Sequence, residues 1–182
     1  MELELTEEQI LLKDMTRNLL NDESSTETVR KLEDDPKGYT DSLWQKMSEL
    51  GLVGLTIPEA YGGGGQSLIE AGILYEELGY HLTPSPHFVS SIIAAGVLTD
   101  AGTEAQKSDL LPAIASGESI VSVAWIEPDR GYGEVGVQMP AVADGSDFIL
   151  NGEKRHVAYA SSADKIIVLA RTDDGVDLFL VD

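Results

Sequence analysis

The stretch Ser122-Val-Ala-Trp-Ile-Glu-Pro128 marks the point at which the residue pattern of the chain changes. Upstream of Gly117 the apolar residues recur at helical spacing, and helix-capping signals separate the segments. Downstream, short runs rich in Val and Ile alternate with turn signals, a pattern typical of antiparallel β structure. We therefore expect an α+β fold, with an all-α domain over residues 1–117 and an antiparallel, β-barrel-like domain over residues 118–182.

The helical region opens with a capping box, Thr6-Glu-Glu-Gln9, and Leu11, Met15 and Leu19 behind it form one apolar stripe. Short helices of this kind bury such stripes by packing on one another. The other helix signals are a cap in Ser24-Ser-Thr-Glu27, a helix from Asp41 to Leu50 closed by Gly51, a helix from Ser67 to Leu78, a helix from Phe88 to Thr99, and the capping box Thr103-Glu-Ala-Gln106 leading into Leu111 before Pro112.

Two features that resemble binding sites have simpler interpretations. The glycines from Gly62 to Gly65 lack the Gly-Lys-Ser/Thr ending of a phosphate loop, so a plain turn is expected. His81 and His87 flank Pro84-Ser-Pro86 without a third candidate ligand, so we interpret them as loop histidines and predict no metal site.

The β region has two turn signals. Leu150-Asn-Gly-Glu-Lys154 predicts a two-residue hairpin turn at Asn151-Gly152, and Asp173-Asp-Gly175 predicts a turn before the strand Val176 to Val181. That last strand still has a face that needs a partner at Asp182, so the β domain is expected to be incomplete here. We expect residues 1–182 alone to have an open edge and poor solubility.

The composition narrows the possible partners. A formal charge of −20, from 32 acidic and 12 basic residues, disfavours nucleic acid and anionic membranes. The absence of cysteine excludes disulfides and thiolate metal sites. The N-terminus lacks an export signal and the apolar runs are too short to span a bilayer, so we expect a cytoplasmic protein without membrane insertion.

Five motifs occur in an order that resembles the acyl-CoA dehydrogenase family, over the chain from about residue 6 to Asp182. They are Glu49-Leu-Gly-Leu-Val-Gly-Leu-Thr-Ile-Pro58 with the glycine turn that follows, Glu76-Glu-Leu-Gly79, Leu111-Pro-Ala-Ile-Ala-Ser-Gly-Glu118, Ile126-Glu-Pro128, and Leu150-Asn-Gly-Glu-Lys154.

The resemblance implies FAD-dependent α,β-dehydrogenation of an acyl-CoA thioester in lipid, fatty acid or sterol side-chain catabolism. It implies a homo- or hetero-tetramer with electron-transfer flavoprotein as the electron acceptor. In the family, a carboxylate base takes the α-proton and flavin N5 takes the β-hydride. That base comes from a C-terminal helical domain, so no residue of this chain is assigned as catalytic.

The resemblance also implies which residues meet the cofactor and the substrate. Ile126 stands where the family has a threonine, and His156-Val157-Ala158 stands for Trp-Ile-Thr, so hydroxyl and indole contacts to the flavin are changed. Tyr132 replaces a serine, and Glu127 is interpreted as a structural turn carboxylate. The expected cofactor residues are Trp125, Ile126, His156, Val157 and Ala158; the expected substrate residues are Phe88, Val89 and Tyr132.

These replacements leave two alternatives open. The chain could be a structural or substrate-binding subunit that does not bind flavin and supports a catalytic partner. It could also keep the fold and catalyse the reaction of a related flavin oxidase or monooxygenase. For Arg130 and Arg155 the alternatives are contact with a phosphate and exposed salt pairing, and salt pairing is expected in so acidic a chain.

Overall fold

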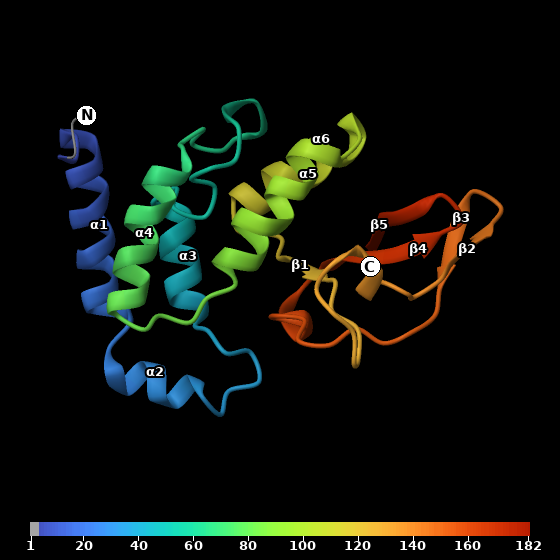
Figure 1. Cartoon of the computed structure of the whole chain (residues 1–182). Helices are drawn as coiled ribbons and strands as arrows, with labels where there is room; N and C mark the ends of the chain where they lie inside the picture. Colours follow the sequence, from blue (N-terminus) through green and yellow to red (C-terminus); the bar gives the residue numbers. More distant parts are fainter. Residues whose placement is uncertain (1–3) are drawn as a thin grey trace. The chain divides into compact units, whose positions relative to one another are not determined.

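The computed structural model describes residues 4–182, which fold into six α-helices followed by short strands (Figure 1). The chain divides into two compact units, a helical unit that ends at Ser119 and a strand unit from Ile120 to Asp182. Among the described residues, no helix combines the length and the apolar character needed to cross a membrane.

The helical unit is built from capped helices, as the sequence predicts. Thr6, Ser67 and Thr103 each close a full capping box with the residue three positions on. Its elements are α1 (Glu7–Glu23), α2 (Thr26–Leu32), α3 (Asp41–Glu49), the 3₁₀ turn η1 (Glu59–Tyr61), α4 (Leu68–Tyr80), the π-helix η2 (Phe88–Ala94), α5 (Ala95–Ala101) and α6 (Glu104–Ala115).

The apolar stripe predicted for α1 is one residue out of register. Leu11 is 69% exposed, whereas Thr16 and Leu20 are buried. The inner face of α1 lies against α4, and two of its cations reach acidic residues there: Lys13 pairs with Glu76, and Arg17 pairs with a neighbouring glutamate. The apolar spacing alone does not indicate this rotation, in which charged residues face α4 beside the buried Thr16 and Leu20.

Three predicted helix boundaries are also wrong. The π-helix η2 and then α5 replace the single helix expected from Phe88 to Thr99. Helix α4 runs through Gly79 to Tyr80. Helix α6 passes Pro112 and ends at Ala115, because a proline in the last turn removes only one backbone bond.

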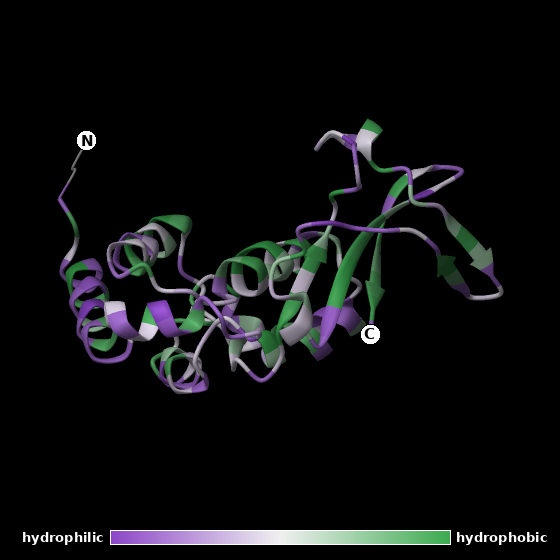
Figure 2. Cartoon of the chain, turned by 90° about the horizontal axis from the view of Figure 1, so that it is seen from below, coloured by the Kyte–Doolittle hydropathy of each residue, from purple (hydrophilic) through white to green (hydrophobic). Residues whose placement is uncertain are grey.

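The core of the helical unit is aliphatic, and Figure 2 shows green hydrophobic positions alternating with purple hydrophilic ones along the helices. The indole N–H of Trp44 donates to the Gly117 carbonyl at 2.9 Å and ties α3 to the end of this unit. Its largest fully buried apolar side chains are Leu20, Met47, Leu52, Val53, Ile57, Leu74, Leu111 and Ile114.

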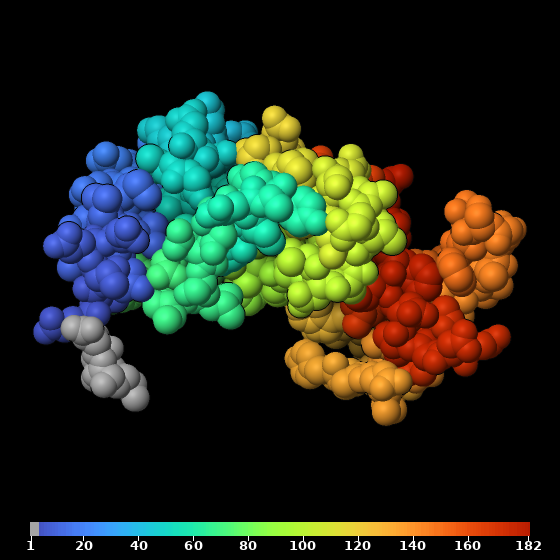
Figure 3. Space-filling model, turned by 90° about the horizontal axis from the view of Figure 1, so that it is seen from above, coloured from blue at the N-terminus to red at the C-terminus, as the bar shows by residue number. Residues whose placement is uncertain are grey.

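The strand unit contains two small open sheets, and within residues 4–182 the strands do not close into a barrel. One sheet has the order β1–β4–β5 and the other is the hairpin β2–β3, which forms an orange lobe beside the red surface of β4 and β5 in Figure 3. The strands are β1 (Val121–Ala124), β2 (Ala141–Asp144), β3 (Asp147–Leu150), β4 (Lys165–Thr172) and β5 (Gly175–Val181).

Of the three strand pairs in the described residues, two have the expected antiparallel pairing and one does not. β4 and β5 pair antiparallel across the predicted turn, with Thr172 opposite Gly175. β1 and β4, however, run parallel, with Val121 opposite Lys165. A parallel pair needs a long crossover, and here residues 125–164 supply it. The candidate site lies on that crossover.

The predicted hairpin turn at Asn151-Gly152 is also wrong. The two-residue turn lies at Gly145 and Ser146, where Asp144 pairs with Asp147 and Gly145 has a φ of +65°. Gly145 meets the positive-φ requirement of such a turn. After Leu150 the chain leaves the sheet, because the segment from Glu153 onward is bonded to the loop that follows β1.

Candidate functional site

Two segments of the crossover lie side by side in the strand unit. The first, residues 125–128, follows β1, and the second, residues 153–158, follows β3. The backbone N–H of Arg155 donates to the Ile126 carbonyl at 2.8 Å. The buried hydroxyl of Ser122 donates to the Ala158 carbonyl at 2.6 Å. The structure therefore brings together the five residues expected at a flavin, although the sequence separates them by about thirty positions.

A buried ion pair joins the same two segments. Lys154 Nζ lies 2.8 Å from a Glu127 carboxylate oxygen, and their side chains are only 6% and 8% exposed. The Glu127 carboxylate also accepts the backbone N–H groups of Gln138 at 3.0 Å and Met139 at 2.9 Å. Glu127 thus holds the turn together, in agreement with its interpretation as a structural carboxylate.

The electrostatics keep Glu127 ionised. Burial by itself would raise the pKa of Glu127, but the bonds from Lys154, Met139 and Gln138 hold that pKa below its ordinary value. A carboxylate that already accepts this set of donors is a poor proton donor near neutral pH. Glu127 is therefore not a suitable general acid.

The backbone of this site is strained. Asp129, His156 and Tyr159 have φ values of +57°, +54° and +54°, in the left-handed region that residues other than glycine rarely adopt. Each such residue costs about 1 kcal/mol or more, and such strain persists only where the surroundings impose it. Strain of this kind clusters at binding and catalytic sites.

The exposed groups of the two segments suit a flat ring. Trp125, Ile126 and Val157 are half-buried, whereas His156 and Ala158 are exposed. An indole and an imidazole can stack on an aromatic cofactor, and the imidazole can also donate a hydrogen bond. The residues therefore fit an isoalloxazine ring, but Ile126 and Ala158 offer hydrocarbon where a hydroxyl could donate.

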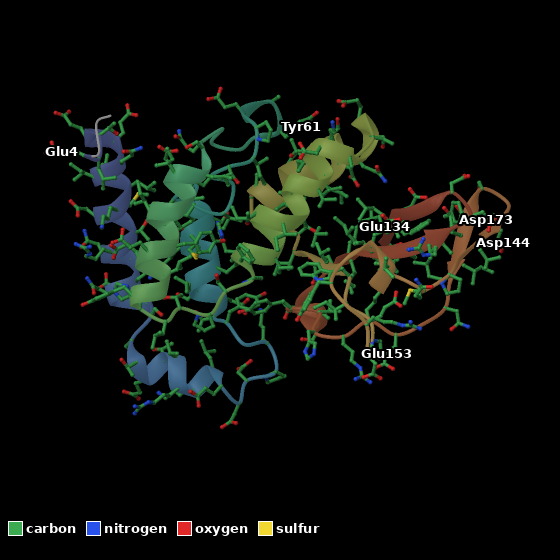
Figure 4. All side chains as sticks on the ribbon, in the orientation of Figure 1. Glu4, Tyr61, Glu134, Asp144, Glu153 and Asp173 are labelled. Carbon is green, nitrogen blue, oxygen red and sulfur yellow. The ribbon has the colours of Figure 1, made fainter. Side chains whose placement is uncertain are left out.

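Charged and aromatic side chains around the site are exposed. Glu153, labelled in Figure 4, pairs with Arg155 at 3.0 Å, so Arg155 forms the exposed salt pair expected of it. Arg130 is exposed. Tyr132 is 82% exposed, so its ring does not fill a cavity of the strand unit.

The expected acyl-contacting residues belong to the helical unit. Phe88 is largely exposed and Val89 is buried, and both lie in the first turn of the π-helix η2. The Phe88 ring packs edge-on against Tyr75, with the ring centroids 5.7 Å apart. Short π-helical segments are frequent at functional sites, which agrees with a substrate role for this turn. The substrate role of Phe88 and Val89 stays a prediction.

The interpretation of His87 as a loop histidine is wrong. His87 is buried at the start of η2, with Nε2 at 2.9 Å from the Leu52 carbonyl. His81 contacts Glu77 and Asn21 through its two ring nitrogens. In the part of the chain that the structure describes, no three His, Asp or Glu side chains are grouped to hold a metal ion.

Sequence reasoning missed three features of the site: the Lys154 ion pair, the Ser122 bond and the left-handed residues. A signal existed for the first, because Lys154 closes the motif Leu150-Asn-Gly-Glu-Lys154. Asp and His are among the residue types enriched at positive φ, which is a weaker signal for Asp129 and His156.

Comparison with protein families identifies the chain. The family model described as acyl-CoA dehydrogenase, N-terminal domain, matches residues 6–118. The chain belongs to the acyl-CoA dehydrogenase family. This result confirms the resemblance carried by the five motifs, and the order of a helical unit and then a partial β unit agrees with it.

The matches to relatives cover most of this chain. "Probable acyl-CoA dehydrogenase YngJ" of Bacillus subtilis is 32% identical over 179 residues, covering 97% of this chain and 47% of that protein. The pig mitochondrial long-chain specific acyl-CoA dehydrogenase (Sus scrofa) is 36% identical over 148 residues, covering 77% of this chain and 34% of that protein. The present chain spans about half, or less, of the length of these relatives.

Two solved structures show how closely the fold agrees. The ChsE4-ChsE5 complex from Mycobacterium tuberculosis matches with a TM-score of 0.88 and 28% identity, covering 100% of this chain and 48% of that one. A glutaryl-CoA dehydrogenase from Mycobacterium smegmatis in complex with FADH2 matches with a TM-score of 0.86 and 28% identity, covering 97% of this chain and 46% of that one.

Proposed function

We propose that the protein carrying this chain is an FAD-dependent acyl-CoA dehydrogenase of lipid catabolism, and that the two crossover segments hold the isoalloxazine ring. The observation that carries the proposal is the bond from Arg155 N to the Ile126 carbonyl, which brings the Trp125 and His156 segments into one site. The chemistry that the flavin supplies when bound is that of the hydride acceptor for the acyl chain.

In this proposal the residues of the chain bind and orient the cofactor and the substrate. Trp125 and His156 offer ring faces to the cofactor, and Ile126, Val157 and Ala158 line it with hydrocarbon and backbone groups. In the helical unit, the acyl-CoA substrate is proposed to meet Phe88, with the buried Val89 packed behind it. In the strand unit, the exposed Tyr132 is a separate candidate for a substrate contact. The proton-accepting carboxylate is supplied from outside this chain segment.

The assembly and the electron acceptor are part of the same proposal. We infer a homo- or hetero-tetramer in the cytoplasm that passes electrons to an electron-transfer flavoprotein. One similar structure carries the printed title "Electron transferring flavoprotein of Acidaminococcus fermentans" and matches with a TM-score of 0.86 at 29% identity.

A specific observation favours a second function. Ile126 and Ala158 lack hydroxyls at two positions next to the proposed ring, and each missing hydrogen bond is worth about 0.5–1.5 kcal/mol. Some similar structures are two-component assemblies by their titles, including the ChsE4-ChsE5 complex and the Tcur3481-Tcur3483 steroid ACAD. The alternative is therefore a subunit that does not bind flavin and supports a catalytic partner.

The flavin content of the purified natural assembly tests both functions. The absorption spectrum of the protein, with and without added FAD, gives the number of flavins per copy of this chain. One FAD per chain supports the dehydrogenase proposal, with acyl-CoA bleaching the flavin band. An assembly with a second type of subunit, in which FAD is bound only by that subunit, supports the alternative and rejects the first proposal.

A further inference from the structure

The buried ion pair between Lys154 and Glu127 is placed where it can shape the candidate site. Its two members come from the two crossover segments, and each is close in sequence to a residue proposed to meet the ring: Glu127 directly follows Ile126, and Lys154 lies two positions before His156. The ion pair therefore links the two segments that are proposed to hold the ring.

Energetics argue that the pair has a role beyond stability. Removing a lysine ammonium and a carboxylate from water is costly, and a buried ion pair adds little net stability over apolar residues of the same size. The cost here is offset by full hydrogen bonding, since Glu127 accepts two backbone N–H groups besides Lys154. What such an arrangement provides is one defined geometry for the segments that it joins.

The segment after Lys154, residues 155–159, has a backbone shape that its surroundings must hold in place. It is bonded at one end through Arg155 N to the Ile126 carbonyl and at the other through the Ala158 carbonyl to Ser122. Between and beside these bonds, His156 and Tyr159 hold left-handed backbone conformations. Strained residues relax toward ordinary φ values when their anchors are removed.

We propose that Lys154 is a positioning residue: through its ion pair with Glu127 it holds residues 155–159 in the strained shape that presents His156 and Ala158 to the flavin ring. This inference rests on the proposed function for the identity of the ring. The effect of Lys154 on the shape of residues 155–159 does not depend on the proposed function. Lys154 touches neither cofactor nor substrate in this proposal and acts only through Glu127.

The experiment uses Lys154→Met, which keeps the length of the side chain and removes its charge. The variant is made in the natural assembly, together with Glu127→Gln and the double variant. Lys165→Met is the matched control, because it makes the same chemical change at the exposed pair with Asp182 in the same unit. Two readouts are measured: amide hydrogen exchange of residues 155–159, and the dissociation constant for added FAD.

We expect exchange at the Arg155 amide to become at least tenfold faster in Lys154→Met and Glu127→Gln, with the β4 amides unchanged. The dissociation constant for FAD should rise about tenfold, the double variant should lose no more than either single one, and Lys154→Arg should recover most of the affinity. Lys165→Met should resemble wild type in both readouts.

The two readouts separate failure of this inference from failure of the proposed function. If the Arg155 amide exchanges at the wild-type rate in Lys154→Met, or if FAD binding is unchanged while the wild type binds FAD, the positioning role is rejected. If the wild type binds no FAD, the flavin proposal fails, and the exchange rates alone still decide whether Lys154 holds the segment.

Discussion

The hydroxyl oxygen of Tyr75 lies 2.6 Å from Nδ1 of His87, and the other ring nitrogen of His87 lies 2.9 Å from the Leu52 carbonyl. A carbonyl can only accept, so Nε2 carries the proton and Nδ1 accepts from the Tyr75 hydroxyl. This chain of bonds connects α4, the start of η2 and the segment after α3. It fixes a neutral imidazole in the core of the helical unit.

Removal of the Tyr75 hydroxyl should destabilise the helical unit. In Tyr75→Phe the buried Nδ1 of His87 loses its donor, and an unsatisfied buried acceptor costs about 1–3 kcal/mol. The free energy of unfolding is measured by urea titration, with Trp44 fluorescence as the reporter in a Trp125→Phe background. Tyr80→Phe is the control, since that ring is exposed, and it should change stability by less than about 0.5 kcal/mol. Equal stability of the two variants would contradict the bonding described.

The same histidine should make the helical unit sensitive to mild acid. Burial lowers the pKa of His87 to about 4, against about 6.5 when unfolded. Between these values the unfolded chain binds an extra proton, so stability is full above pH 6.5 and falls as the pH drops toward 4. The expected loss from His87 is about 2 kcal/mol between pH 7.5 and pH 5.

Urea titrations at the two pH values measure that loss. His87→Gln should remove most of the pH dependence in this range, although the variant is less stable at pH 7.5. His81→Gln, at the end of α4 in the same unit, should keep the wild-type dependence. A pH response that is the same in both variants would show that His87 is not the titrating group.

Two glycines of the helical unit should respond in opposite directions to alanine. A Cβ on Gly63 would lie 2.0 Å from the Ile57 carbonyl oxygen, so the turn after η1 must move. A Cβ on Gly72, in helix α4, would meet nothing within 4 Å. We expect Gly63→Ala to cost about 2 kcal/mol or more, and Gly72→Ala to add about 0.5–1 kcal/mol because alanine favours the helix. Thermal melts of both variants check the prediction; stabilisation by Gly63→Ala would contradict it.

The sequence predicted local features of the fold well where a single residue type meets a local requirement, such as a hydrogen bond at the start of a helix or a tight turn. The capping boxes at Thr6 and Thr103 and the turn at Asp173-Asp174 are such cases, because each depends on neighbours in sequence. The rotation of α1 was not predictable in this way. The face of α1 that packs on α4 includes Thr16 and the cation Arg17, and this is known only once the two helices pack.

In the candidate site, too, local motifs were predictable from the sequence and non-local contacts were not. The motif around Ile126 and the motif around Lys154 could each be recognised, and the resemblance to a family placed both at a cofactor. The bond that joins them, and the parallel pairing of β1 with β4 that makes the connection a crossover, are non-local. The Asn-Gly signal at Asn151 does not indicate that the following segment is bonded to the loop after β1, through Lys154 and Arg155.

Loss of Arg17 should destabilise the helical unit, because it removes a partner of the buried Glu77 carboxylate. The Glu77 side chain is almost fully buried, and Arg17 holds it with two bonds of 2.7 and 3.0 Å. Arg17→Met leaves this charge with Lys13 at 4.0 Å as its nearest cation, so we expect a clear loss of stability in the urea titration. Glu77→Leu in the same variant should recover most of it. Lys31→Met, at the exposed pair with Glu27, should change stability by less than about 0.5 kcal/mol.

Hydroxyls restored at the candidate site should strengthen flavin binding. Ile126→Thr and Ala158→Ser each place a donor where the present residue offers only hydrocarbon, and one hydrogen bond is worth about 0.5–1.5 kcal/mol. The dissociation constant for FAD, measured by quenching of flavin fluorescence, should therefore fall about two- to tenfold for each change. Ala160→Ser, in the neighbouring 3₁₀ turn from Ala160 to Ser162, makes the same chemical change away from the two segments and should have no effect. If the control strengthens binding as much as Ile126→Thr and Ala158→Ser do, the ring does not lie against Ile126 and Ala158.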